Sequence, residues 1–259
     1  MGRLLLGVLI GVALLLPGRP ALADELMVFA ASSLTEAFTD IGRQYEQEYP
    51  ESRVVFHFAG SQALAAQIEQ GAAVEVFAPA NEDVMTRLRQ QGLVEAPAFF
   101  AGNSLVLIVS RQTVQPLPDL ASLALPGRLL VIGAPAVPVG RYTQQLFDSL
   151  AADPAYGPSF VGGIRRNLVS QEASVKAVAT KVALGEADAG VVYASDLTPY
   201  LLERVRVIPL PEAHAPAVRY PVALVADSSQ KMSARRFVNY LLSPRGQSLL
   251  AEHGFVPPR

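Results

Sequence analysis

The stretch Val28-Phe-Ala-Ala-Ser-Ser-Leu-Thr-Glu-Ala-Phe38 decides how the N-terminal part of the chain folds. A short apolar run breaks into small residues, two hydroxyls follow at Ser32 and Ser33, and a helical pattern then begins. The apolar residues of that pattern recur at i, i+4, i+7 and i+11: Leu34, Phe38, Ile41 and Tyr45. The stretch therefore predicts a strand, a tight turn and the N-terminus of a helix.

Such a turn is a natural seat for an anion. The first N–H groups of a helix have no acceptor within the helix, and the helix dipole adds roughly half a positive charge there. The hydroxyl of Ser33 supplies a further donor, so an anion can be held without any formal charge. The alternative is that Ser33 is only a helix N-cap, which is a common role for serine.

The first 23 residues have the pattern of a secretory signal peptide. A positive start at Arg3 precedes the apolar run Leu4–Leu16, which is too short for the roughly 20 residues needed to span a bilayer. Pro17-Gly18 breaks that run, and Ala21-Leu22-Ala23 is a small-x-small cleavage site. We expect cleavage after Ala23 and a soluble mature chain that starts at Asp24, without a lipid anchor because no Cys follows the apolar run.

The composition excludes several classes of protein. Without the signal peptide, 19 basic residues remain against 23 acidic ones, a net charge of −4, which argues against nucleic acid as a partner. Cysteine is absent, so disulfides, thiolate catalysis and cysteine metal sites are excluded. The mature length suits two lobes of ordinary size.

Strand-like and helix-like segments alternate along the mature chain. Strands are expected at 26–29, 54–58, 74–77, 105–109, 129–132, 164–169, 189–193, 205–208 and 220–225. Helices are expected between most of them: one runs to about Glu48, one starts with Asn81 as its N-cap, and two more cover 230–242 and the segment after Pro244. This alternation predicts an α/β fold with parallel-rich sheets flanked by helices, and the prolines at 116 and 118 mark a change of lobe.

Four strand-to-helix turns stand out, and they end at Ser33, Ser61, Val139-Gly140 and Ser174-Val175. Ligands of open parallel sheets bind beyond the carboxyl ends of the strands, where these turns lie. Four helix N-termini of about half a charge each sum to roughly two positive charges, which matches a dianion.

The turns offer hydrogen-bond donors rather than acceptors. Hydroxyls and amides with no neighbouring acid suit an oxyanion that has no proton to donate, and Glu172 is the nearest acceptor. Arg141 and Lys176 sit one residue past two of the turns, and helix geometry points them along the cleft or away from it. Whether any of these three charged residues touches a ligand is left open.

Several pieces of the chain resemble, in their order, the periplasmic molybdate-binding proteins of bacterial ABC uptake transporters. The matching pieces cover almost all of the mature chain: Val28-Phe-Ala-Ala-Ser-Ser-Leu34, Phe58-Ala-Gly-Ser61, Gly102-Asn-Ser-Leu105, Val137-Pro-Val-Gly140, Gly185-Glu-Ala-Asp-Ala-Gly190 with Val191-Val-Tyr193, and Tyr220-Pro-Val222. The resemblance implies a two-lobed periplasmic binding protein of type II, with the ligand cleft between the lobes. It places residues 24–104 and 224–259 in the first lobe and residues 105–223 in the second.

The resemblance also implies a set of ligand contacts. Ser33 and Ser61 would give hydroxyl and amide donors from the first lobe, Val139 and Val175 would give backbone amides from the second, and Tyr193 would give its phenol. These are contacts to the oxygens of the anion, and none is a direct ligand of the metal. Val139 stands where the family often has Ala, and the segment around Val175 departs from the usual acidic or amide residue followed by Val-Arg. On its turn alone Ser61 is an N-cap, and Tyr193 by default is a core aromatic.

The sequence therefore predicts a solute-binding protein with no catalysis and no cofactor, whose ligand is molybdate or tungstate. Its partner is expected to be the membrane permease of an ABC transporter, and it is expected to be a periplasmic monomer that does not bind nucleic acid. A binding protein for another tetrahedral oxyanion, such as sulfate, is the alternative, because the donors would be the same. A secreted serine hydrolase is a remote alternative, because the Ser-x-x-Lys pattern at Ser228–Lys231 has no supporting motif. The three histidines are scattered along the chain and are interpreted as structural or surface residues: His57, His214 and His253.

Overall fold

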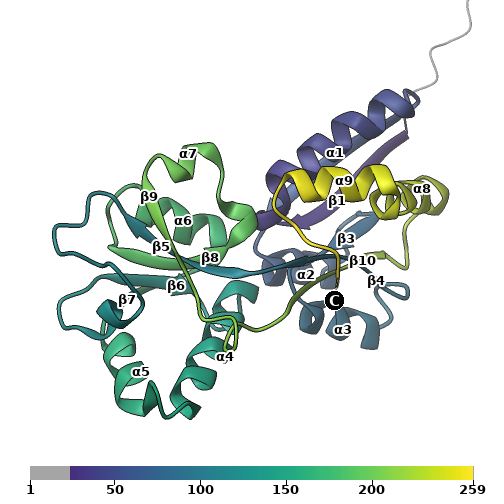
Figure 1. Cartoon of the computed structure of the whole chain (residues 1–259). Coiled ribbons are helices and arrows are strands. Elements are labelled where there is room, and N and C mark those ends of the chain that lie inside the picture. Colours follow the sequence, from purple (N-terminus) through teal and green to yellow (C-terminus); the bar gives the residue numbers. More distant parts are fainter. Residues whose placement is uncertain (1–23, 259) are drawn as a thin grey trace, which may run out of the picture.

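The computed structural model describes residues 24–258, which form two lobes side by side (Figure 1). The predicted signal peptide and its cleavage after Ala23 lie outside the described residues. Within the described part of the chain, no helix is long and apolar enough to cross a membrane.

The first lobe is built on a five-stranded sheet with the order β2-β1-β3-β10-β4. Its strands are β1 (Asp24–Ala31), β2 (Ser52–Ala59), β3 (Val76–Ala78), β4 (Ala98–Asn103) and β10 (Val218–Leu224). β1 runs parallel to both β2 and β3, whereas β10 runs antiparallel to β3 and β4. β1 is apolar over most of its length because helices cover both faces of the sheet.

The second lobe repeats this plan with the order β7-β6-β8-β5-β9. Its strands are β5 (Leu105–Ser110), β6 (Leu130–Gly133), β7 (Leu168–Glu172), β8 (Ala189–Tyr193) and β9 (Val205–Pro209). β6 is parallel to β7 and β8, and β5 is antiparallel to β8 and β9. In both lobes, therefore, three parallel strands end at the same edge of the sheet.

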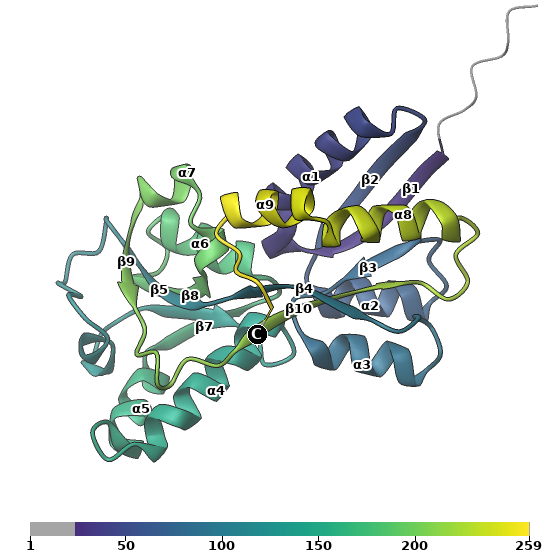
Figure 2. The same ribbon diagram turned by 45° about the vertical axis from the view of Figure 1, so that its right-hand side comes forward.

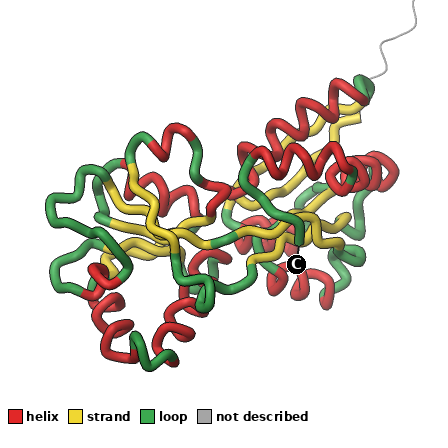
Figure 3. The backbone as a smooth tube through the Cα atoms, in the orientation of Figure 1, coloured by secondary structure: helices red, strands yellow, loops and turns green. Residues whose placement is uncertain are grey.

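Helices cover both sheets, as Figures 2 and 3 show. In the first lobe α1, α8 and α9 pack on one face and α2 and α3 on the other. Their bounds are α1 (Thr35–Glu48), α2 (Ser61–Glu69), α3 (Glu82–Gln90), α8 (Lys231–Leu242) and α9 (Pro244–Glu252). The second lobe carries α4 (Pro138–Ala152), α5 (Gly157–Arg166), α6 (Val175–Ala183) and α7 (Pro199–Leu202). Three short 3-10 helices complete the set: η1 (Ser32–Leu34), η2 (Ala121–Ala124) and η3 (Ala194–Asp196).

The first lobe has an aromatic core beneath α1. Phe38 is fully buried and contacts three other rings, with centroids 5.6–6.3 Å apart: Phe56, Phe100 and Phe237. Aromatic pairs at such separations stabilise the fold beyond the contribution of the apolar area that they bury. This core holds α1 against the sheet and so positions the turn that precedes it.

Two strand connections join the lobes. β4 passes directly into β5 through Ser104, and the chain returns from β9 to β10 over residues 210–217. β4 and β10 pair with each other, so the two connections lie side by side (Figure 2). Because β10 belongs to the first sheet, residues 218–223 lie in the first lobe, and the predicted second-lobe range of 105–223 extends too far. The apolar pattern of this strand indicates burial, but it does not indicate which sheet the strand joins.

Three local predictions differ from the structure. The first half of the strand predicted at 164–169 is the end of α5, and β7 begins only at Leu168. Val161 and Ile164 face the core from one side of that helix, and Gly163 approaches the backbone of Ala124 too closely for a larger residue. The segment at 133–140, predicted as a loop, contains the first turn of α4. Ser33 lies within η1, and it is not the N-cap of α1.

We expect Gly140→Ala to destabilise the protein, because its β-carbon would overlap the carbonyl oxygens of Gly133 and Ala134. Overpacking of this kind costs about 1–3 kcal/mol. Gly162→Ala is the matched control: it lies inside α5, and its β-carbon would lie 3.6 Å from a side-chain nitrogen of Arg166, which is ordinary contact. The control should gain up to about 1 kcal/mol, because alanine is the better helix former. Urea unfolding measures both free energies of unfolding, and an equal stability of the two variants would contradict the expectation.

Candidate functional site

The five residues predicted as ligand contacts line one cavity between the two lobes. The first lobe contributes Ser33 and Ser61, and the second lobe contributes Val139, Val175 and Tyr193. The rest of its wall is formed by Ala80, Val137 and Pro138. The cavity is narrow: its volume is about 10 Å³, which is enough for one water molecule.

Three of these residues stand in the first turn of a helix that follows a parallel strand. Ser61 and Val175 are the first residues of α2 and α6, and Val139 follows Pro138 at the start of α4. The N–H groups of a first turn have no acceptor inside their own helix. One helix of the first lobe and two helices of the second therefore bring unpaired amides and the positive ends of their dipoles to one cavity.

The side-chain hydroxyls at the cavity are buried and differ in their partners. The Ser61 Oγ accepts a hydrogen bond from the backbone N–H of Ala80 at 3.0 Å, and the Ser33 Oγ lies 3.1 Å from the Tyr220 hydroxyl. The Tyr193 hydroxyl has no hydrogen-bond partner among the residues that the structure describes. Burial raises the pKa of the Tyr193 phenol well above its usual value, so this group stays protonated and offers a donor.

The charged side chains near the turns do not line the cavity. Arg141 forms an ion pair with Asp83 at 2.6 Å, and Glu172 lies 2.6 Å from the amine of Lys181. Arg141, Lys176 and Glu172 all stand outside the cavity wall.

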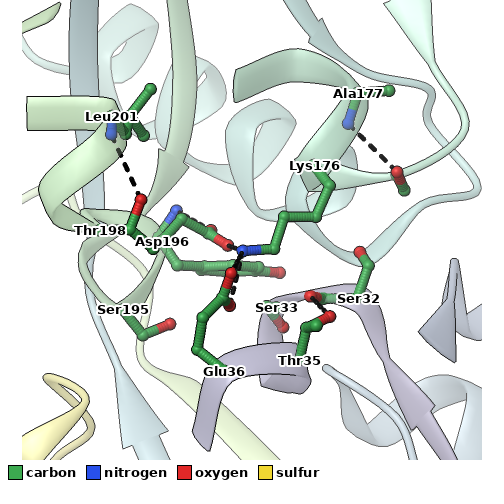
Figure 4. A network of polar contacts seen from close by, with 12 residues as sticks. Ser32, Ser33, Thr35, Glu36, Lys176, Ala177, Ser195, Asp196, Thr198 and Leu201 are labelled. Atoms are coloured by element: carbon green, nitrogen blue, oxygen red, sulfur yellow. Dashed lines mark hydrogen bonds and ion pairs between the residues drawn. The ribbon is translucent and has the colours of Figure 1, made fainter. Parts of the chain in front are cut away.

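Polar contacts bridge the lobes at the rim of the site. The Lys176 amine of α6 reaches both carboxylate oxygens of Glu36 on α1, at 2.7 and 2.9 Å (Figure 4). The Gln62 side-chain amide donates to the carbonyl of Ala173 at 3.1 Å. Partly exposed ion pairs contribute only about 0.2–1 kcal/mol each, so they hold the lobes together weakly enough for them to separate.

Asp196 lies behind the site as the last residue of η3, the 3-10 helix that directly follows β8. It is fully buried, and its Oδ2 accepts a hydrogen bond from the backbone N–H of Tyr193 at 3.0 Å. Its Oδ1 lies 3.7 Å from the Lys176 amine (Figure 4). Burial raises the pKa of this carboxyl to about 7, against a smaller lowering by the lysine. Asp196 therefore fixes the end of β8 from which the Tyr193 side chain reaches the cavity.

Other candidate groups lie apart from the site. His253 pairs with Asp40 at 2.7 Å and His214 with Asp153 at 2.9 Å, in keeping with their predicted structural roles. Ser228 accepts a hydrogen bond from the backbone of Gln230, and Lys231 pairs with Glu95. No group of three histidine, aspartate or glutamate side chains that could hold a metal ion occurs among residues 24–258.

Two polar residues next to the site were not singled out from the sequence. Tyr220 contacts Ser33, and Asn103 contacts Tyr220 at 3.2 Å. Both stand in pieces that carried the family resemblance, which was the available signal. Their contacts join positions more than a hundred residues apart, so no local pattern assigns them a role.

These features together define a class: a two-lobed α/β protein with a small cavity between its lobes that is lined by uncharged hydrogen-bond donors. The comparison with protein families agrees with this class. Residues 26–256 match the model described as bacterial extracellular solute-binding protein, and the chain belongs to that family.

Individual relatives and solved structures show which members of the family and of the fold this chain is similar to. The molybdate-binding protein ModA of Mycobacterium tuberculosis is 36% identical over 237 residues, covering 91% of this chain and 86% of the relative. The solved structure of the periplasmic molybdate-binding protein of Azotobacter vinelandii has a TM-score of 0.77 at 20% identity, covering 90% of this chain and all of that one. The sulfate-binding protein SubI of M. tuberculosis has a TM-score of 0.76 at 17% identity, covering 90% and 87%. At such identities the two structures show a shared fold alone.

We expect Asp196→Asn to flatten the dependence of stability on pH. A carboxyl whose pKa is about 7 in the folded protein and about 3.9 in the unfolded chain stabilises the fold fully below about pH 4. That stability is lost as the pH rises to about 7. Chemical unfolding between pH 4 and 8 should show a smaller decline of the unfolding free energy in the variant, and an unchanged decline would show that Asp196 titrates like an exposed carboxyl.

Proposed function

We propose that this protein binds molybdate, and tungstate with it, and delivers the ion to the membrane permease of an ABC transporter for uptake. The observation that carries the proposal is the single cavity lined by Ser33, Ser61, Val139, Val175 and Tyr193. The family is one of solute-binding proteins, and its named relatives above include a curated molybdate-binding protein at 36% identity. Solute binding without catalysis follows from the same comparisons.

The chemistry of the cavity supports a doubly charged oxyanion that carries no proton. Amides at three helix starts and three hydroxyls offer hydrogen bonds, and hydrogen bonds to an ionised acceptor are the strong kind. Among residues 24–258, no carboxylate lines the wall to accept a proton from the ligand. Binding then follows from lobe closure, because the ion gains contacts to both lobes only in the closed state.

The geometry also favours entry by separation of the lobes. A tetrahedral oxyanion is larger than the one-water space between the donors, so the lobes must move apart before the ion is seated. The two adjacent connections, β4 to β5 and β9 to β10, are the segments about which such a movement turns. The bridging contacts of Lys176 and Gln62 then re-form at the rim.

The proposed setting is the periplasm. The family is described as extracellular, and we propose that residues 1–23 are removed by cleavage after Ala23. We further propose that the mature protein acts as a monomer, since one chain supplies all five contacts.

Calorimetric titration of the ligand-free protein tests the proposal. We expect tight binding of molybdate and tungstate, and no comparable heat from sulfate or phosphate. Sulfate is the alternative that matters, because the fold is shared with a sulfate-binding protein and the donors suit both ions. A preference for sulfate or phosphate would refute the proposal.

Two serine variants test the site itself. Ser33→Ala and Ser61→Ala each remove a donor to a charged ligand, so each should weaken molybdate binding by about 1.5–3 kcal/mol. Ser110→Ala is the matched control, because the Ser110 Oγ also accepts from a backbone N–H but lies away from the cavity. The control should leave affinity unchanged in the same titration, and unchanged affinity in both site variants would place the ligand elsewhere.

Tyr193→Phe should weaken binding without lowering stability. The phenol hydroxyl is buried without a partner in the described chain, so its removal should leave the ligand-free protein equally stable or stabilise it by about 1–3 kcal/mol. The same change removes a donor to the ligand and should weaken molybdate binding. Thermal unfolding without ligand and titration with molybdate measure the two effects, and a loss of stability together with unchanged binding would assign Tyr193 to the core alone.

A further inference from the structure

A chain of polar side chains leads from the connection between the lobes to Ser33. Asn103 is the last residue of β4, where the chain leaves the first lobe, and Tyr220 lies in β10, the neighbouring strand. The Asn103 side-chain nitrogen contacts the Tyr220 hydroxyl at 3.2 Å, which in turn lies 3.1 Å from the Ser33 Oγ. All three side chains are buried, and neither Asn103 nor Tyr220 lines the cavity.

The direction of these hydrogen bonds follows from the amide of Asn103. Its Oδ1 accepts from the backbone N–H of Ser104 at 2.9 Å, which fixes the amide orientation. The Nδ2 therefore points the other way and can only donate, to the hydroxyls of Tyr220 and of Ser195 at 3.2 and 2.8 Å. The Tyr220 oxygen accepts this bond, so its single proton is directed to the Ser33 Oγ.

Tyr220 keeps that proton at any ordinary pH. Burial raises the pKa of its phenol well above the usual value. Ser33 thus accepts a hydrogen bond from Tyr220, and its own proton is free to point into the cavity. The Ser61 Oγ also accepts a hydrogen bond, from the backbone N–H of Ala80, so the Ser61 proton is likewise free to point into the cavity.

We propose that Asn103 and Tyr220 are positioning residues that hold the Ser33 hydroxyl as a donor toward the ligand, so that the site selects oxyanions without a proton. This inference rests on the proposed function, because it assigns a cause to the selectivity of that same cavity. A ligand that carries a hydroxyl needs an acceptor, whereas Ser33 and Ser61 each already accept one hydrogen bond and are left with their own protons to direct at the ligand. Only the Ser33 arrangement depends on side chains, so it alone can be altered while the serine stays in place.

Tyr220→Phe is the direct test. The ring packs against Phe100, Phe255 and Tyr193 with centroids 5.4–6.1 Å apart, and phenylalanine keeps these contacts. Without the phenol, the Ser33 hydroxyl can rotate and can accept as well as donate. We expect molybdate to bind about tenfold more weakly, which is the upper range for one neutral hydrogen bond.

The selectivity readout compares two dianions at pH 8. Molybdate carries no proton there, whereas inorganic phosphate is mostly the singly protonated dianion. Phosphate binding is measured by displacement of bound molybdate. Phosphate should bind to the variant no more weakly than to the wild type, so the ratio of the two affinities should fall by about tenfold. An equal loss for both ions would mean that the phenol serves only packing and would overturn the proposal.

A double-mutant cycle shows whether Tyr220 acts through Ser33. In the Ser33→Ala background, Tyr220→Phe should change the molybdate affinity less than about twofold, because the group that it positions is gone. Additive effects, or an unchanged affinity of Tyr220→Phe alone, would overturn the proposal. Tyr45→Phe is the control, since Tyr45 is fully buried in the first lobe away from the cavity and should leave both affinities unchanged.

Two further arms keep the test decisive. Thermal unfolding reports whether Tyr220→Phe is folded, and if it is not, Asn103→Ser replaces it, since the shorter side chain no longer donates to Tyr220. This variant should lower the molybdate-to-phosphate ratio in the same direction, and an unchanged ratio would overturn the proposal. A wild-type protein that binds no molybdate would instead refute the proposed function, so the two failures are distinguishable.

Discussion

The structure depends on bringing hydrogen-bond donors that carry no formal charge to one point between two sheets. A backbone N–H at a helix start is a weak donor to a charge in water, but in a buried site it is neither screened nor hydrated. Three such starts, at Ser61, Val139 and Val175, face one cavity. The remaining donors are hydroxyls, which add directional bonds to the same point.

The fold supplies this convergence through its sheet topology. In each lobe three parallel strands end at one edge, and helices begin directly after them. The two lobes are joined by adjacent strands, so the two edges face each other across a short connection. The same architecture explains why the cationic side chains stand at the rim. Lys176 and Arg141 lie one step further along their helices and are paired with carboxylates of the opposite lobe.

Neutral donors and rim charges have separate roles in this arrangement. The bridging pairs of Lys176 with Glu36 and of Arg141 with Asp83 are partly exposed, and they therefore bias the lobes toward closure only weakly. In the proposed function the strong differential contact would come from the ligand, which would touch both lobes at once. Such a site would respond to its ligand, because closure without the ion gains little free energy.

The sequence by itself determined the alternation of strands and helices and the turns that end at Ser33, Ser61, Val139 and Val175, because both are local. Tyr193 was singled out only by the family resemblance. Apolar periodicity, the Asn81 N-cap and the small residues after β1 can each be read within a dozen residues, and the structure has Asn81 as a cap. Predictions from local pattern failed where contacts between residues far apart in the sequence decide the structure. Ile164 was predicted in a strand and lies in α5, and residues 218–223 were predicted in the second lobe and belong to the first sheet.

Only the tertiary structure decided what surrounds the five positions. It placed Arg141, Lys176 and Glu172 outside the cavity wall, and it brought Tyr220 and Asn103 to Ser33 from the two strands that join the lobes. The physical reason is that a hydrogen bond needs an approach of about 3 Å, which the chain reaches here only after folding back over more than a hundred residues. A residue's type and its immediate neighbours set what bond it can make, and the packing of the two sheets sets whether a partner is there.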